Sequence, residues 1–179
     1  MNARKVSSAS QLAWQLSLLL SLMVLAGALL GSEGWAVSSL QADIALMTDI
    51  RLPRTLGACL AGALLGLAGA VAQGLFRNPL ADPYLLGSAS GASLGVALGM
   101  VMLSQLDVSP WLVRAGVTGM AFMGAWLAVA LSLMLSWGVQ HTLRLLLAGV
   151  VVGVVLGAIA SLLLVMYPQI QGSVQSFML

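Results

Sequence analysis

Two short polar stretches hold most of the residues that could do chemistry in this chain. The first is Arg51-Leu52-Pro53-Arg54 and the second is Arg77-Asn78-Pro79-Leu80-Ala81-Asp82-Pro83. Two arginines three positions apart suit carboxylates on an approaching protein, where fixed charges mainly set encounter rate and register. In the second stretch the two prolines and the neighbouring Asn78 and Asp82 favour a rigid turn. The alternative is a cytoplasmic element near a gate.

The sequence offers little for catalysis or metal binding. It has no GxxxxGK[ST] motif, so the chain does not bind ATP through a P-loop. Cys59 and His141 are single, which excludes a disulfide framework and a multi-histidine metal site. An intramembrane protease would need Ser88, Ser90 or Ser93 to meet His141, which is predicted in a loop at the membrane edge. We therefore expect no catalytic residue, no metal site and no cofactor.

The composition is that of an integral membrane protein. The chain is 60% hydrophobic and 7% charged, with a mean hydropathy of +1.05. Soluble domains carry roughly 25% charged residues, so these few charges could not cover a surface that faces water. The net charge of +2 is too small to indicate nucleic-acid binding.

Five apolar segments have about the length that crosses a bilayer. The first is too long for a signal-peptide core, and a piece that looks amphipathic, Ser39 to Ile50, follows it. The fold class we predict is all-α, a polytopic bundle of about five spans forming one transmembrane domain over residues 1–179. The predicted spans are Leu12–Leu30, Thr55–Leu75, Leu86–Leu103, Val113–Ser136 and Leu143–Met166.

The positive charges favour a cytoplasmic N-terminus by a narrow margin. On that choice four basic residues face the cytoplasm and three face outward. The pair Arg51 and Arg54 then lies outside, against the usual bias, which makes it a candidate for function. Anchoring to phospholipid headgroups is the alternative role for these side chains.

Small residues recur every fourth position in three of the predicted spans. In lipid, helices associate through close backbone contact, which stripes of small residues permit. The sequence therefore predicts a tightly packed bundle, and close contacts of this kind could also let helices shift when a pathway opens. The residues we expect at helix contacts are Gly62, Gly66, Gly91, Gly95, Gly153 and Gly157.

The chain resembles the permease family of ATP-binding-cassette importers for iron-siderophores, haem and vitamin B12. The resemblance is carried by RLPR at 51–54, by AQGLF at 72–76 with RNPLADP and LLG after it, and by TLRLLLAG at 142–149. It covers nearly the whole chain but only about the first half of the family's pattern. The resemblance implies ten helices per subunit, a dimer of permease subunits, a separate cytoplasmic ATPase and a periplasmic substrate-binding protein.

The resemblance also implies roles for individual residues. Arg51 and Arg54 match periplasmic arginines that dock the binding protein, and Thr142 and Leu143 match the cytoplasmic gate region. The second, third and fifth helices would border the translocation path. Gln73 lies within them, although an interhelical hydrogen bond is the alternative role for its amide. The remaining candidates for the path or its loop are Asn78, Pro79 and Asp82.

The family places its coupling helix and five further spans beyond the point where this chain stops, at Leu179. We therefore expect a fragment or truncated product of an inner-membrane permease. The alternative is a small structural or channel-like protein whose helices oligomerise without transport coupling. Few intramembrane charges suit a bulky chelate, and siderophores, haem and cobalamin fit that requirement equally.

Overall fold

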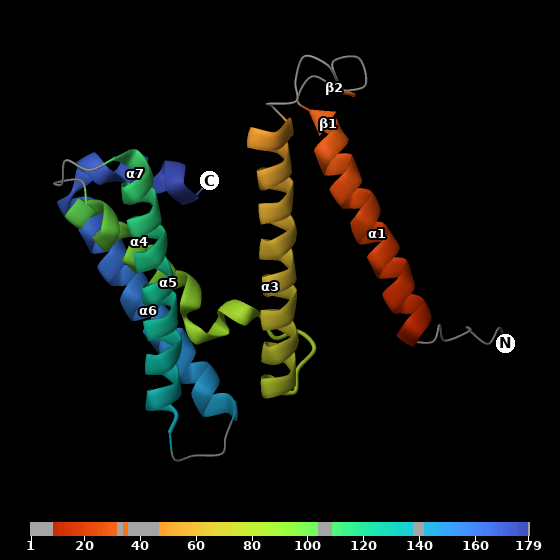
Figure 1. Cartoon of the computed structure of the whole chain (residues 1–179). Helices are drawn as coiled ribbons and strands as arrows, with labels where there is room; N and C mark the ends of the chain where they lie inside the picture. Colours follow the sequence, from red (N-terminus) through yellow and green to blue (C-terminus); the bar gives the residue numbers. More distant parts are fainter. Residues whose placement is uncertain (1–8, 32–33, 36–46, 104–108, 138–141, 179) are drawn as a thin grey trace. The chain divides into compact units, whose positions relative to one another are not determined.

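The computed structural model describes residues 9–31, 34–35, 47–103, 109–137 and 142–178, and helices dominate them (Figure 1). Contacts divide the chain into two compact units, Met1–Leu67 and Ala68–Leu179. Each unit is described by itself. The single transmembrane domain expected from the sequence stays a prediction.

The first unit contains α1 and the beginning of α3. A pair of two-residue strands follows α1, with Leu30 opposite Trp35 in antiparallel register. Thr55 lies beside Gly27, since a Cβ added to this glycine would lie 3.2 Å from the threonine Cγ2. The elements are α1 (Ala9–Leu29), β1 (Leu30–Gly31), β2 (Gly34–Trp35), η2 (Met47–Arg51) and α3 (Leu52–Phe76).

The predicted amphipathic piece, Ser39 to Ile50, lies only partly within the described residues. Its last four residues belong to η2, a π-helical turn that leads directly into α3. Pro53 stands in the first turn of α3, where its missing N–H costs little. Residues 39–46 lie outside the part of the chain that the structure describes.

The second unit contains the end of α3 and the remaining helices. A short 3₁₀ helix and a single glycine precede α4, so the third predicted helix begins at Ser88 rather than Leu86. The elements after α3 are η3 (Pro83–Leu86), α4 (Ser88–Leu103), α5 (Pro110–Leu135), α6 (Thr142–Met166) and α7 (Pro168–Met178).

Four helices among the described residues are long and apolar enough to cross a membrane: α1, α3, α5 and α6. They agree with four of the five predicted spans. The fifth, α4, is apolar but has 16 residues, fewer than the roughly 20 that a spanning helix needs. It is shorter than predicted because the chain leaves helical geometry at Gly87.

Glycines set the contact between α4 and α5. A Cβ on Gly91 would clash with the carbonyl oxygen of Gly124, and one on Gly95 would clash with that of Met120. Residue numbers rise along α4 as they fall along α5, so the two helices run antiparallel. The absence of side chains at these glycines permits a backbone approach that any larger residue would prevent.

The helix α7 does not appear among the sequence predictions. It packs on α4 and α6, and its Ile170 and Val174 join a buried cluster with Val96 and Val117. These side chains are between 0% and 4% exposed. The core of the second unit therefore includes a short helix that turns back after Tyr167.

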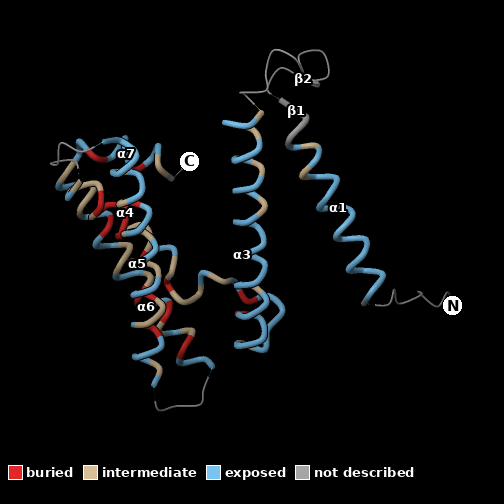
Figure 2. Tube along the Cα trace, in the orientation of Figure 1, coloured by how far each residue is buried: buried red, intermediate tan, exposed pale blue. Residues whose placement is uncertain are grey.

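Buried positions gather on α4 to α7, while α1 is exposed along most of its length (Figure 2). The exposed side chains of α1 are mainly leucines, such as Leu16 and Leu18. A helix that is apolar all round suits contact with acyl chains rather than water. The all-α membrane bundle predicted from the sequence is confirmed.

Candidate functional site

The turn after α3 is held by backbone and side-chain hydrogen bonds. Arg77 adopts left-handed backbone geometry, with φ of 48°. The next amide, of Asn78, donates to the carbonyl oxygen of Gln73 at 3.2 Å. The side-chain Oδ1 of Asn78 then accepts from the amide of Leu80 at 2.9 Å. These bonds make the segment before Asp82 a fixed turn, as its asparagine and prolines predict.

Asp82 caps the 3₁₀ helix η3. Its Oδ1 accepts from the backbone N–H of Tyr84 at 2.6 Å, and Pro83 occupies the first helical position. This helix ends at Gly87, whose φ of 79° is left-handed and whose N–H donates to the carbonyl oxygen of Tyr84 at 2.9 Å. Asp82 therefore caps η3 and not α4, which begins at Ser88.

A groove follows the face shared by α4 and α6. It consists of two adjoining cavities of about 460 and 380 Å³ that share Ala89 and Ser90. We call it the α4–α6 groove. Its main lining residues are Asp82, Tyr84, Ala89, Ser90, Ser93, Gly149, Gly153, Gly157, Ser161, Gln171 and Gln175.

The two helices that form this groove run parallel. A Cβ on Gly153 would lie 3.5 Å from the Cα of Gly87, and one on Gly157 would lie 3.6 Å from the Oγ of Ser90. The groove therefore extends from Asp82, before α4, to Gln175 on α7.

The lining of the groove is uncharged except at one end. Asp82 is the charged residue among those lining the two cavities. The hydroxyls of Ser93 and Ser161 donate to carbonyl oxygens of their own helices, at 3.0 and 2.9 Å. Their lone pairs remain as acceptors, and the amides of Gln171 and Gln175 add donors. Such a surface suits a large ligand with scattered hydrogen-bonding groups and little need for a counter-charge.

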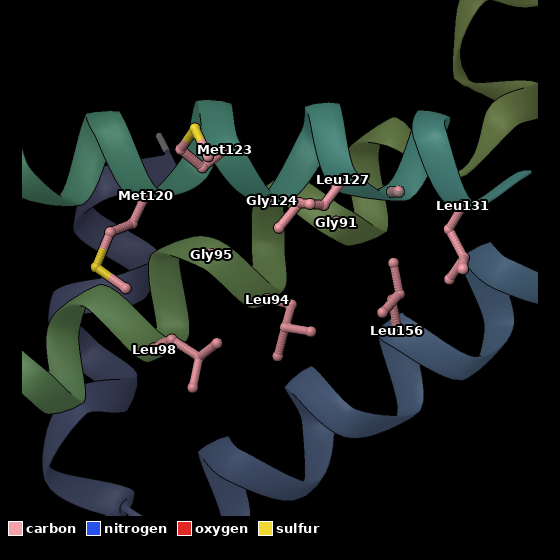
Figure 3. A pocket seen from close by; sticks show the side chains of 11 residues that line it. Gly91, Leu94, Gly95, Leu98, Met120, Met123, Gly124, Leu127, Leu131 and Leu156 are labelled. Atoms are coloured by element: carbon pink, nitrogen blue, oxygen red, sulfur yellow. The ribbon is translucent and has the colours of Figure 1, made fainter. Parts of the chain in front are cut away.

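A third cavity, of about 250 Å³, is wholly apolar. Figure 3 shows Leu94 on α4, Leu131 on α5 and Leu156 on α6 around it, beside the close contact of Gly91 with Gly124. Its lining side chains are aliphatic or thioether groups, none of which donates a proton. It contributes packing space rather than chemistry.

The structure brings together only some of the predicted site residues. Asp82 lines the α4–α6 groove, whereas the predicted path residues Gln73, Asn78 and Pro79 are exposed and line none of the three cavities. Thr142 and Leu143 form the exposed beginning of α6 and also lie outside these cavities. Their role at a gate stays a prediction.

The predicted packing glycines fall into two groups. Gly91 and Gly95 lie at the α4–α5 contact, and Gly153 and Gly157 border the groove. Among the described residues, nothing lies within 4 Å of a Cβ added to Gly62 or Gly66. A contact at these last two glycines stays a prediction.

The arginine pair belongs to the first unit. Arg51 ends η2 and is half-buried, and Arg54 is exposed in the first turn of α3. Among the described residues, no three histidine, cysteine or acidic side chains gather as a metal site. His141 lies outside the described residues.

Sequence reasoning missed Ser132 and the glutamines of α7. Ser132 is 0% exposed and is the buried polar residue among those described. Its hydroxyl donates to the carbonyl oxygen of Leu86, which lies 46 residues earlier, at 3.0 Å. No local pattern marks this serine, but Pro168 with Ile170, Val174 and Phe177 at helical spacing could have revealed α7.

These features define a multi-pass helical membrane protein with a weakly charged groove between its helices. The FecCD transport family matches residues 13–179, and the chain belongs to this family. Its long apolar helices and its family make it a multi-pass protein of the bacterial inner membrane. The resemblance predicted from the sequence is confirmed.

Three relatives illustrate the range of the family. The chain is 40% identical over 141 residues to the ferric enterobactin transport system permease protein FepD of Escherichia coli K12, covering 77% of this chain and 40% of the relative. It is 39% identical over 130 residues to the hemin transport system permease protein HmuU of Yersinia pestis, covering 72% and 38%. It is 41% identical over 155 residues to the vitamin B12 import system permease protein BtuC of Salmonella paratyphi A, covering 82% and 44%. The chain thus spans less than half the length of these curated relatives.

Proposed function

We propose that this chain forms part of the permease subunit of an ATP-binding-cassette importer for an iron chelate, haem or cobalamin. The match of residues 13–179 to the FecCD transport family is the observation that carries the proposal. The similar relatives are named for ferric enterobactin, hemin and vitamin B12 transport. All three cargoes are large chelates, so the proposal stops at that class.

The α4–α6 groove is the part of the cargo path that this chain supplies. Its small residues Ala89, Gly153 and Gly157 leave room beside the helices, and Ser90 and Ser161 offer weak polar contacts. A transport path must bind its cargo weakly enough to release it. A surface with scattered hydroxyls and one terminal carboxylate meets that requirement better than a charged site would.

Three partners belong to the proposal. A second permease subunit completes the membrane pathway, and a separate cytoplasmic ATPase supplies the energy of hydrolysis. A periplasmic binding protein delivers the cargo and docks on Arg51 and Arg54, at the entrance to α3. The N-terminus, the turn from Arg77 to Asp82 and the gate residues Thr142 and Leu143 then face the cytoplasm.

The test uses chimeric permeases, in which this chain replaces the matching segment of FepD, HmuU or BtuC. Each chimera is produced in cells that lack the corresponding permease, and uptake of labelled ferric enterobactin, hemin or vitamin B12 is measured. At least one chimera should restore uptake that depends on the ATPase. The cargo that the working chimera carries indicates which of the three chelates this chain transports.

The competing account is a structural or channel-like membrane protein without transport coupling. It predicts that all three chimeras insert at normal levels and assemble with their ATPases, yet none restores uptake. It also predicts that any leak through the chain alone continues when the ATPase is inactivated. Either result, obtained with properly assembled chimeras, would overturn the proposal.

A further inference from the structure

Ser132 is a polar side chain in the interior of an otherwise apolar helix bundle. Its residue is 0% exposed, and burying a hydroxyl without a hydrogen bond is costly. Two acceptors lie within reach of its Oγ, the carbonyl oxygens of Leu86 and Ala128, each at 3.0 Å. Ala128 is one turn back on the same helix, whereas Leu86 belongs to the end of η3.

The carbonyl of Leu86 lies where the chain leaves one helix and enters the next. Gly87 adopts left-handed geometry and closes η3 through its N–H to Tyr84. The hydrogen bonds of α4 then begin with the N–H of Gly91 donating to the carbonyl oxygen of Gly87 at 3.0 Å. The break thus leaves the Leu86 carbonyl to a side-chain donor, and a backbone carbonyl buried away from water needs such a partner.

The break also packs against α6. A Cβ on Gly149 would lie 2.9 Å from the Cα of Leu86, and a Cβ on Gly87 would lie 3.1 Å from the backbone nitrogen of Gly153. The backbone from Leu85 to Gly87 therefore lies directly against the α6 backbone. Ser132 on α5 and Gly149 on α6 hold the same short segment from two directions.

We propose that Ser132 is a positioning residue, whose hydrogen bond to Leu86 fixes the break between η3 and α4. Asp82 and Tyr84 lie within four residues of that carbonyl and line one end of the α4–α6 groove. Fixing the break therefore determines the position of these two side chains relative to α6. The consequence for transport rests on the proposed function, but the position of the break does not.

The first test measures amide hydrogen exchange in the complete 179-residue chain, purified in detergent, for Ser132→Ala and Ser161→Ala. Both hydroxyls have the carbonyl oxygen one turn back within hydrogen-bonding distance, and that of Ser132 also reaches the carbonyl oxygen of Leu86 outside its own helix. Exchange at Gly87 and Gly91 should become roughly tenfold faster in Ser132→Ala, as the loss of a buried hydrogen bond implies. It should stay unchanged in Ser161→Ala.

The second test measures position directly. Spin labels at Tyr84 on η3 and Val150 on α6, both accessible side chains beside the groove, report the distance between the two elements. The distribution of this distance should be broader in Ser132→Ala than in the unsubstituted chain. It should be narrow again in Ser132→Thr, which restores the hydroxyl. Gly149→Ala should disturb the same amides and the same distance from the α6 side.

Two outcomes would overturn the proposal. One is equal exchange at Gly87 and Gly91, with equal distance distributions, in Ser132→Ala and Ser161→Ala. The other is a uniform rise in exchange over all of α4 and α5, which would show that Ser132 only supports general packing. If Ser132→Ala fails to fold, Ser132→Cys, which nearly keeps the size of the side chain but donates only weakly, decides by the exchange criterion. Neither measurement needs cargo or ATPase, so failure here is separate from failure of the transport proposal.

Discussion

The Oγ of Ser132, in the last turn of α5, lies 3.0 Å from the carbonyl oxygen of Leu86, at the end of η3. Glycines of α6 pack against the backbone at the same break. Around it lie the capped turn at Asp82 and one end of the α4–α6 groove. A buried hydroxyl, a capped turn and one end of the groove thus lie close to the point where the chain passes from η3 to α4.

The contact between α4 and α5 should not tolerate a side chain at Gly124. A Cβ there would clash with the carbonyl oxygen of Gly91, so Gly124→Ala should lower the free energy of unfolding by about 1–3 kcal/mol. Gly119→Ala is the matched control on the same helix, because nothing described lies within 4 Å of its added Cβ. It should be neutral or stabilise by up to about 1 kcal/mol. Denaturant unfolding in detergent measures both, and equal stabilities would argue against the close contact.

The cap at Asp82 should depend on an acceptor atom rather than on charge. Asp82→Ala removes the acceptor for the Tyr84 amide and should cost roughly 0.5–2 kcal/mol of stability. Asp82→Asn keeps a side-chain oxygen and should remain close to the unsubstituted chain. Thermal unfolding of the two variants shows whether the cap depends on the acceptor atom or on the charge. Equal losses in both would show that the carboxylate charge matters and the hydrogen bond does not.

The proposed topology places the two ends of α4 on opposite sides of the membrane. Single cysteines at Leu80 and Ser109, in a Cys59→Ala background, mark these ends, and both positions are exposed. An impermeant thiol reagent should label the cysteine at 109 in intact cells and the one at 80 only after the membrane is permeabilised. The reverse pattern would place the N-terminus outside.

The arginine pair should govern docking of the binding protein through long-range charge. In a working chimeric permease, Arg51→Glu with Arg54→Glu should weaken docking, because carboxylates on the partner would then meet like charges. The defect should shrink with salt, since the Debye length falls from about 10 Å at 0.1 M to about 3 Å at 1 M. A pull-down of the binding protein at the two salt concentrations measures the docking defect. Unchanged docking of the double variant at low salt would remove the arginines from the interface.

Much of the fold could be predicted because the length and apolar composition of membrane helices identify them in the sequence. The long spans that became α3, α5 and α6 follow from apolar runs bounded by charge or proline. The turn around Asn78 and Asp82 follows from the short-range chemistry of those side chains. In each case the residues that form the feature are close together in the sequence.

The site was less predictable because its parts come from separate helices. Ser132, Ser93 and Ser161 all stand in apolar helices and all bond the carbonyl one turn back. Only the approach of Leu86 distinguishes Ser132, and that approach depends on a left-handed glycine and on the packing of α4 against α5. Likewise the groove could not be predicted, since it needs the parallel pairing of α4 with α6.

The most direct measurement of the central claim asks whether cargo passes along the α4–α6 groove. A single cysteine at Ser90, where the two cavities meet, is introduced into a working chimeric permease in the Cys59→Ala background. A cysteine at Phe122, which is 71% exposed on α5, is the control. The rate of thiol labelling is then compared with and without cargo during ATP hydrolysis. The account predicts slower labelling at position 90 in the presence of cargo and no change at position 122. Equal labelling rates at position 90 with and without cargo, in a chimera that transports, would contradict it.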